Sequence, residues 1–380
     1  MSIQRLLKGF EVELFTGRTN GEHVGVAAAL TSDFPDFVRE PDQRNLEYIT
    51  APEAEYSLLK EALLAPRRRL RRWLAPRELT LIPGSTLSLG DSTRFERSDP
   101  LNSYHDLIEA TYGTRVVTTS IHINLGLDDL DQLFAALRLV RCEAALLLSL
   151  SASSPFLDGQ PTGAHSQRWK QFPLTPAKVP LFRNHDDYVS WVEHQLANGN
   201  MRNERHLWTS VRPNGPRRPY ELNRLELRIC DLITNPDVLL AITALMELRV
   251  ISLVLQQEQL DPLQASHLSA TELADLSDAN DSEAAQHSLE ANLHHWRDGQ
   301  SITCRAWIQE LLDEVTPLAQ DLDLMEQLSP LHVVLQEGNQ AMQWLQGYST
   351  GQSVQELIQE GIRAMNAEEL ATIKSEAVLG

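Results

Sequence analysis

Four short segments of the chain alternate apolar side chains with polar side chains of chemically active types. Side chains at positions i and i+2 of a β-strand lie on the same face, so each segment predicts a strand with one apolar and one polar face. Strands of this kind are typical of an antiparallel sheet that buries one side only. The segments are 9–15, 45–48, 120–125 and 224–229, and their polar faces would carry Glu11 and Glu13, Asn45 and Glu47, Ser120, His122 and Asn124, and Arg224, Glu226 and Arg228.

A solvated sheet face is the simpler interpretation of any one of these strands, because antiparallel sheets often keep one side in water. The set as a whole favours a second interpretation, in which the four polar faces meet in one cavity. Solvated faces usually carry Lys, Thr, Gln and Ser, whereas these carry carboxylates, an imidazole, an amide and arginines.

A shared cavity would bring several carboxylates together, and like charges at short range repel each other or take up protons. A divalent cation relieves this repulsion. Mg²⁺ prefers hard oxygen ligands and commonly bridges to substrate phosphates, whereas zinc would prefer more His or Cys. With one His and interleaved arginines, the cavity indicates Mg²⁺–nucleotide chemistry in which arginines neutralise a transferring phosphate. The carboxylates are Glu11, Glu13, Glu40, Glu47 and Glu226.

The composition argues against several other classes of protein. The 380 residues include 33 Lys and Arg against 52 Asp and Glu, and the net charge of −19 opposes sequence-independent nucleic-acid binding. Three cysteines without a CxxC pair point to a reducing compartment. The sequence predicts no signal peptide, and its best apolar run, 144–150, is far shorter than the roughly 18 residues of a membrane-spanning helix. We therefore expect a cytoplasmic protein that binds neither nucleic acid nor membrane.

The chain also divides by composition. Residues 1–250 hold the strand-like segments and are expected to form the domain with the site, and residues 251–380 are expected to form a helical region packed on it, where a homodimer could form. The acidic stretch 275–284 is interpreted as a mobile loop. Helical patterns predict helices over 54–73, 130–150, 237–260, 282–295, 304–323 and 354–376.

Three further features are interpreted as structural. The basic run 67–73 predicts a solvated helix face. Strand parity places Cys230 on the polar side of its strand, although a free cysteine is usually a small buried hydrophobe. His294 and His295 would point apart on an expected helix, which argues against a metal site there.

Five motifs, taken in order, resemble the glutamate–cysteine ligases (γ-glutamylcysteine synthetases), and most closely the cyanobacterial type. Each motif is weak alone, but five in the family's order are more specific. The resemblance covers roughly residues 8–245. The motifs are the strand 9–14, Glu40 and Glu47 seven residues apart, the His122-x-Asn124 strand, the segment 151–168 and the segment 224–231.

The resemblance implies a fold and a reaction. The fold is α+β, a glutamine-synthetase-like carboxylate–amine ligase in which a curved antiparallel sheet forms a funnel-shaped active site with helices outside. With ATP and Mg²⁺, such an enzyme phosphorylates the γ-carboxylate of glutamate, and the amine of cysteine displaces phosphate to give γ-glutamylcysteine for glutathione biosynthesis. A ligase with a different amine acceptor and a non-catalytic relative are the alternatives.

The resemblance also implies residue roles. Arg228 matches an arginine near the transferred phosphate and would act in catalysis together with Glu226. Arg168 and Arg212 are matched to a substrate carboxylate or to ATP phosphates. The implied metal ligands are Glu11, Glu13, Glu40, Glu47, His122 and Glu226.

Two more positions are assigned to substrate or ATP binding. Asn124 stands where bacterial relatives often carry a second His, and its amide can still coordinate or hydrogen-bond. Arg115, just before the His122 strand, faces either a substrate or a surface acid.

Overall fold

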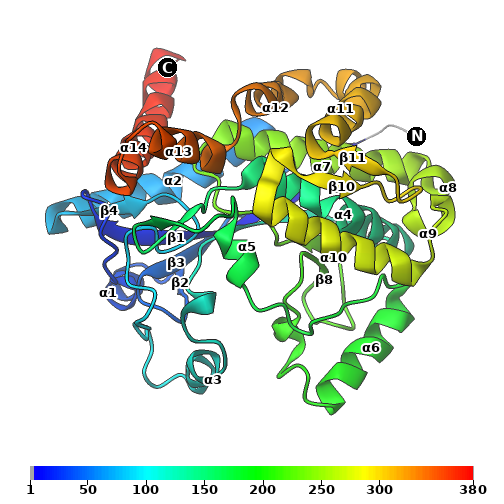
Figure 1. Cartoon of the computed structure of the whole chain (residues 1–380), viewed down its shortest axis with the longest axis horizontal. Helices are drawn as coiled ribbons and strands as arrows, with labels where there is room; N and C mark the ends of the chain where they lie inside the picture. Colours follow the sequence, from blue (N-terminus) through cyan, green and yellow to red (C-terminus); the bar gives the residue numbers. More distant parts are fainter. Residues whose placement is uncertain (1–3, 380) are drawn as a thin grey trace.

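The computed structural model describes the backbone of residues 4–379 and the side chains of residues 4–370. Its centre is a seven-stranded sheet in which every pair of neighbours is antiparallel (Figure 1). The order is β2-β3-β1-β5-β9-β8, and β4 pairs with the end of β1. The predicted α+β fold with an antiparallel sheet is therefore confirmed. The strands are β1 (Lys8–Arg18), β2 (Phe37–Arg39), β3 (Asn45–Ile49), β4 (Leu79–Ile82), β5 (Ile121–Gly126), β8 (Val211–Asn214) and β9 (Arg224–Leu227).

One face of the sheet is apolar and is covered by three helices, α2 (Tyr56–Leu74), α4 (Leu130–Ser151) and α7 (Pro236–Leu255). Side chains of alternate strand positions, such as Val12 and Ile123, are fully buried against them. Local signals start these helices. The side chain of Asp129 caps α4, and that of Asn235 caps α7 directly before Pro236. Figure 1 shows α4 and α7 on one side of the sheet and α3 and α6 on the other.

Helix α7 corrects one expectation. The 20 residues Pro236–Leu255, with a mean hydropathy of 2.2, are long and apolar enough to span a membrane by length and composition alone. The pattern of apolar residues in the sequence instead predicts the best apolar run at 144–150. In the structure 78% of the apolar stretch of α7 is buried inside the protein, which is the environment of a core helix.

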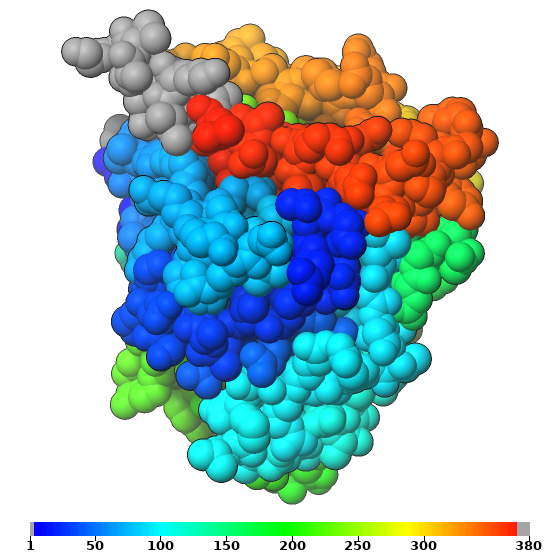
Figure 2. Space-filling view, turned by 90° about the vertical axis from the view of Figure 1, so that its left-hand side faces the viewer, coloured from blue at the N-terminus to red at the C-terminus, as the bar shows by residue number. Residues whose placement is uncertain are grey.

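The C-terminal region is helical and packs on the outer side of α4 and α7. Helix α10 lies against α4, and α11 and α12 lie against α7. Figure 2 shows α13 and α14 crossing one side of the molecule above α2, where Arg71 pairs with Glu369. The elements are α8 (Gln257–Leu260), α9 (Pro262–Ala265), α10 (Ala270–His287), η4 (Ser288–Glu290), β10 (Asn292–His294), β11 (Ser301–Thr303), α11 (Cys304–Asp321), α12 (Met325–Glu337), α13 (Gln340–Ser349) and α14 (Val354–Leu379).

The interpretation of 275–284 as a mobile loop is wrong, because these residues form the middle of α10. The helix begins with a capping box between Ser269 and Glu272. Its acidic residues Asp278 and Asp281 pair with Arg141 of α4, so the acidic stretch matches a buried arginine. The sequence alone did not show this partner.

The helix expected over 282–295 is also wrong in its second half. Helix α10 ends at His287, and Ser288 follows with a positive φ of 45°, which turns the chain away from the helix axis. His294 then lies on strand β10, and the ring of His295 stacks on Trp307. Neither belongs to a metal-ligand group among the described residues.

Arg67 lies elsewhere than expected, whereas Cys230 is the small buried hydrophobe that a free cysteine usually is. Arg67, within the basic run, is fully buried and donates to the carbonyls of Thr234 and Ile233 at 2.6 and 3.2 Å. Cys230 lies beyond the end of β9 and is buried with its Sγ 3.8 Å from the Leu147 carbonyl of α4, so strand parity does not extend to it.

Short elements connect the layers and cover the polar side of the sheet. Near the polar face these are α3, α5 and η3. The connecting elements are α1 (Ala27–Asp33), η1 (Ala75–Arg77), α3 (Ser103–Tyr112), η2 (Gly113–Val116), β6 (Phe156–Leu157), β7 (Gln160–Pro161), α5 (Gln167–Gln171), α6 (His185–Ala197) and η3 (Glu204–His206).

Candidate active site

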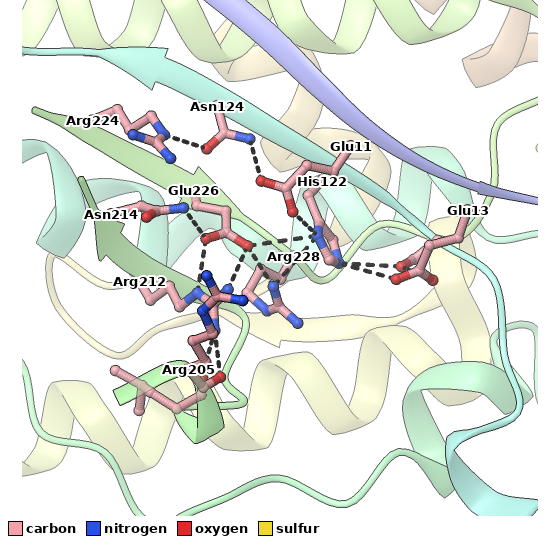
Figure 3. A network of polar contacts seen from close by, with 12 residues as sticks. Glu11, Glu13, His122, Asn124, Arg205, Arg212, Asn214, Arg224, Glu226 and Arg228 are labelled. Carbon is pink, nitrogen blue, oxygen red and sulfur yellow. Dashed lines mark hydrogen bonds and ion pairs between the residues drawn. The ribbon is translucent and has the colours of Figure 1, made fainter. Parts of the chain in front are cut away.

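The register of the sheet brings the predicted polar side chains side by side. Glu11 of β1 lies opposite His122 of β5, and Asn124 of β5 lies opposite Glu226 of β9. On the other edge of β1, Glu13 pairs with Glu47 of β3. Figure 3 shows that the side chains of β1, β5 and β9 converge on one face of the sheet; they are Glu11, Glu13, His122, Asn124 and Glu226. Glu47 lines the same cavity as Glu13 and His122. The four polar faces therefore meet, and the interpretation as a simple solvated face is not needed.

His122 is the centre of this group. Its Nδ1 lies 3.0 Å from Glu11 Oε2 and 3.5 Å from Glu226 Oε1, and its Nε2 lies 3.9 Å from Glu13 Oε1. Potential ligand atoms of Glu11, His122 and Glu226 all lie within 4.8 Å of one another. Among the described residues this is the only such group of three or more His, Cys, Asp or Glu side chains.

Glu226 is buried and held from several sides. Arg212 of β8 donates to both of its oxygens at 2.8 and 3.0 Å, and Asn214 Nδ2 donates at 2.7 Å. Arg228 Nη1 donates to Oε1 as well. Burial alone would raise the pKa of Glu226, but Arg212, Arg228 and His122 together hold it well below its ordinary value. The carboxylate is therefore charged and fixed in orientation.

The three predicted arginines have different positions. Arg228 contacts Glu226 and, at 3.4 Å, His122 Nδ1. Nη1 of Arg212 donates to the carbonyls of Arg205 and Leu207, both at 3.0 Å. Because its other two nitrogens donate to Glu226, the structure shows Arg212 as the partner of that carboxylate. Their predicted roles toward substrate or ATP stay predictions.

Arg168, on α5, is 2% exposed and lies behind Arg228. Its guanidinium donates to the carbonyls of Arg228 and Ile229 at 3.0 and 2.9 Å. Its Nε has no hydrogen-bond partner among the described residues, and the side chain lines the cavity described next. Its predicted contact with a substrate carboxylate also stays a prediction.

A cavity of about 310 Å³ opens beside this group. Three of its lining residues are Glu13, Glu40 and Glu47, and neither Glu40 nor Glu47 has an ion pair or a side-chain hydrogen bond among the described residues. Burial and the charge of Glu13 raise the pKa of Glu40 to about 8. Burial and the charges of Glu40, Glu11 and Glu13 raise that of Glu47 well above its ordinary value.

This charge distribution fits divalent cations. The carboxylates that lack protein cations point into one cavity, and their oxygens are the donors that Mg²⁺ prefers. A cation beside them would remove the repulsion that raises the pKa values of Glu40 and Glu47. Together with the Glu11–His122–Glu226 group, all six predicted metal ligands lie on this face.

A second cavity, also of about 310 Å³, lies at the other end of the polar face. It is lined by Glu11, Asn124 and Arg224 among others. Asn124 joins the two charged residues, because its amide donates to Glu11 Oε1 at 3.3 Å and accepts from Arg224 Nε at 3.2 Å. The Glu11–His122–Glu226 group thus lies between two cavities.

Arg115 is the one predicted site residue that the structure does not bring to this face. It lies on η2, is exposed, and its Nε donates to the Tyr112 carbonyl at 3.3 Å. It lines neither cavity.

Sequence reasoning missed Asn214 and the aromatic side chains Tyr104, Phe172 and Trp208 that line the first cavity. For Asn214 a signal was present, since Arg212 and Asn214 alternate in Val211–Asn214. Pro213 between them argues against a strand, but β8 is an edge strand, where proline is tolerated.

Comparison with known proteins agrees with this geometry. A profile described as glutamate–cysteine ligase family 2 (GCS2) matches residues 7–368. The chain belongs to this family. The predicted resemblance is confirmed at that level.

Two curated relatives are similar to the chain at 26% identity. "Putative glutamate--cysteine ligase 2" of Gloeobacter violaceus matches over 242 residues, 63% of this chain and 62% of the relative. "Putative glutamate--cysteine ligase 2-3" of Rubrobacter xylanophilus matches over 287 residues, 73% of this chain and 72% of the relative. The match thus spans less than two thirds of the length of the first relative and somewhat more of the second. The resemblance to a cyanobacterial type stays a prediction.

A solved structure shares the fold. Glutamate–cysteine ligase of Francisella tularensis, in complex with AMP, superposes with a TM-score of 0.74 and 14% identity, covering 97% of this chain and 89% of that chain. At this identity the likeness shows the fold alone.

Proposed function

We propose that the protein is an ATP- and Mg²⁺-dependent glutamate–cysteine ligase of the cytoplasm. The observation that carries the proposal is the polar face, where six possible metal ligands and Arg228 lie together beside two cavities. A carboxylate–amine ligase must bring together two anionic substrates, a carboxylate and a nucleoside triphosphate. It needs metal ions and an arginine because these cations offset the repulsion between the two anions.

The proposed reaction has two steps. An oxygen of the glutamate γ-carboxylate forms a bond to the γ-phosphorus of ATP, and the bond from that phosphorus to ADP breaks. The amine nitrogen of cysteine then attacks the γ-carbonyl carbon of the γ-glutamyl phosphate. The carbon–oxygen bond to phosphate breaks, the nitrogen loses a proton, and γ-glutamylcysteine and inorganic phosphate result. Catalysis of this kind rests on positioning and charge stabilisation.

Different parts of the polar face are assigned to the substrates, to Mg²⁺ and to Arg228. We assign the substrates to the two cavities of the polar face, one lined by Asn124 and Arg224 and the other by Glu13 and Phe172. Mg²⁺, held by the six predicted ligands, would neutralise charge on the phosphoryl group. Arg228 lines the cavity that also contains Glu13, Glu40 and Glu47. Its side chain is held by Glu226, and its backbone N–H donates to the Ser210 carbonyl at 2.7 Å.

Phosphate release from ATP tests the proposal, with Mg²⁺, glutamate, and either cysteine or a panel of other amines. We expect cysteine to give the largest stimulation and γ-glutamylcysteine to be seen by mass. A larger stimulation by another amine would make the protein a ligase with a different acceptor. Absence of turnover with every amine would mean a non-catalytic relative.

Glu226→Gln tests the site itself. The substitution keeps the shape of the side chain but removes its charge. We expect turnover to fall at least 100-fold, on the order seen when a group that stabilises charge in the transition state is removed. Glu326→Gln, on the exposed side of α12, is the matched control. Full turnover in Glu226→Gln would show that the reaction takes place elsewhere.

A further inference from the structure

A buried polar network connects the C-terminal region to Arg228. Helix α10 lies against α4, and α4 lies against β8 (Figure 1). Asp281 of α10 pairs with Arg141 of α4, with 2.9 Å between Oδ2 and Nη1. The same Nη1 donates to Ser210 Oγ, and the Ser210 carbonyl accepts the backbone N–H of Arg228 at 2.7 Å. The network thus passes from α10 through α4 to the start of β8 and the end of β9.

The members of this network are shielded from water. Ser210 is fully buried, and Asp281, Arg141 and Arg228 are each less than a tenth exposed. Electrostatic contacts are stronger in such surroundings than in water, and solvent does not freely replace a partner that is removed. The orientation of Ser210 therefore depends on where the guanidinium of Arg141 is held.

Ser210 lies where a small displacement would change the polar face at several points. Two residues before it, Trp208 lines the first cavity. Two residues after it, Arg212 donates to both oxygens of Glu226. The carbonyl of Ser210 holds the backbone of Arg228, which lines the same cavity as Trp208. One anchored residue thus fixes part of the cavity wall and the two arginines that hydrogen-bond to Glu226.

A second buried ion pair between α4 and the C-terminal region provides an internal comparison. Arg138, one turn before Arg141 on α4, donates to the carboxylate of Asp261 at 2.8 and 2.6 Å. Its Nη1 donates to the carbonyls of Phe182 and Arg183 at 2.9 and 2.8 Å. Neither of these two residues lines a cavity of the polar face. The two ion pairs have the same chemistry on the same helix, but only one of them continues to the polar face.

We propose that Asp281 of the C-terminal region is a positioning residue for Arg228. Its carboxylate holds the guanidinium of Arg141, and this guanidinium holds the hydroxyl of Ser210. The anchored Ser210 in turn fixes the backbone of Arg228. The inference rests on the proposed function, because an effect on turnover requires that Arg228 acts in catalysis. The helical C-terminal region is then a part of the catalytic apparatus and not only a cover for the sheet.

Matched variants of the two ion pairs separate positioning from stability. Asp281→Asn and Asp261→Asn each remove one buried negative charge opposite an arginine of α4, so both should lower the midpoint of urea unfolding. Asp281→Asn should also lower kcat for phosphate release about tenfold, in the range known for small misplacements near a reaction. The KM for glutamate should change by less than about threefold. Asp261→Asn should keep kcat within about twofold of the unmodified protein.

The pH of the assay matters for this comparison. Burial raises the pKa of Asp281 to about 7 against the charge of Arg141. The assays are therefore run at about pH 8.5, where the carboxylate of the unmodified protein is ionised.

Ser210→Ala tests the link and leaves the ion pair in place. It removes the hydroxyl that Arg141 contacts and keeps the backbone carbonyl. We expect a decrease in kcat similar to that of Asp281→Asn. Combined in one protein, the two substitutions should lower kcat little more than either alone, because they break the same network. If the two decreases multiply, the residues act independently and the inference is wrong.

Two further results would overturn the inference. One is an unchanged kcat in Asp281→Asn, and the other is an equal decrease of kcat in Asp261→Asn. If Asp281→Asn does not fold, Ser210→Ala decides, and an unchanged kcat in that variant would overturn the inference as well.

Hydrogen exchange keeps the inference separate from the proposed function. If the unmodified protein shows no turnover, the proposed function fails, but the network can still be tested. The backbone amide of Arg228, which donates to Ser210, should exchange faster in Asp281→Asn and Ser210→Ala than in Asp261→Asn. Equal exchange rates in the three variants would refute the positioning of Arg228 by Asp281.

Discussion

Replacing Arg168 with methionine separates two roles for a buried arginine. One role is direct contact with a substrate carboxylate, and the other is positioning of Arg228 through its carbonyl. The structure favours the second, because the guanidinium already donates to the carbonyls of Arg228 and Ile229. Methionine keeps much of the length of the side chain and removes both donors.

The magnitude follows from the two carbonyls. A buried carbonyl that loses its donor costs about 1–3 kcal/mol, so the pair predicts about 2–6 kcal/mol. The adjacent cavity lets water reach part of this region, so we expect a decrease in the free energy of unfolding of about 2 kcal/mol, at the low end. A misplacement of Arg228 by about 1 Å would lower kcat by about 10- to 100-fold.

Urea unfolding and steady-state kinetics with glutamate check both effects. We expect kcat to fall while the KM for glutamate changes by less than about threefold. Arg205→Met is the control, since Arg205 lines the same cavity but is exposed, and its removal should leave stability within about 0.5 kcal/mol. A raised KM with unchanged kcat and stability in Arg168→Met would refute the positioning role.

Three further predictions concern stability. His23 is buried without a hydrogen-bond partner for its ring nitrogens among the described residues, and burial lowers its pKa to about 3. The imidazole takes up a proton near pH 6.5 in the unfolded state but only near pH 3 in the folded state, so the free energy of unfolding should fall as the pH drops below about 6.5. In urea unfolding at about pH 5, His23→Phe should abolish about 2 kcal/mol of this decrease. The same pH dependence in both proteins would contradict this. Arg67→Met should lower the free energy of unfolding by about 2–4 kcal/mol, because two carbonyls lose a donor, whereas the exposed Arg72→Met should change it by less than about 0.5 kcal/mol; similar values for both would refute the distinction. Truncation after residue 260 removes α10–α12, which pack on α4 and α7, and so exposes apolar surface on these two helices. Light scattering should therefore show aggregates. A soluble, active monomer would show that the C-terminal region is dispensable.

The sequence predicted the polar face well because a period of two is a direct consequence of strand geometry. Glu11, His122 and Glu226 could be placed on matching faces before any pairing was known. The order of the strands was not accessible, since β1 pairs with β5 more than 100 residues later in the chain.

The errors have a common physical cause, which is a partner distant in sequence. Arg67 belongs to a basic run and reads as solvated, but two carbonyls of the segment after β9 accept its donors. The acidic middle of α10 reads as a loop until Arg141 of α4 is placed beside it. Helical periodicity describes one element and contains no information about such pairings.

The order in which the polar face is synthesised affects how the chain can fold on the ribosome. Glu11, Glu13, Glu40 and Glu47 all lie within the first 50 residues, but Glu226 and Arg228 follow about 180 residues after Glu47. At about 5–20 residues per second, the nascent chain carries the early carboxylates for roughly 10–35 s before Arg228 is made. During that interval mutual repulsion would oppose close pairing of β1 with β3 unless a soluble cation takes the place of the missing arginines. The supply of free Mg²⁺ during synthesis would then influence the yield of folded protein.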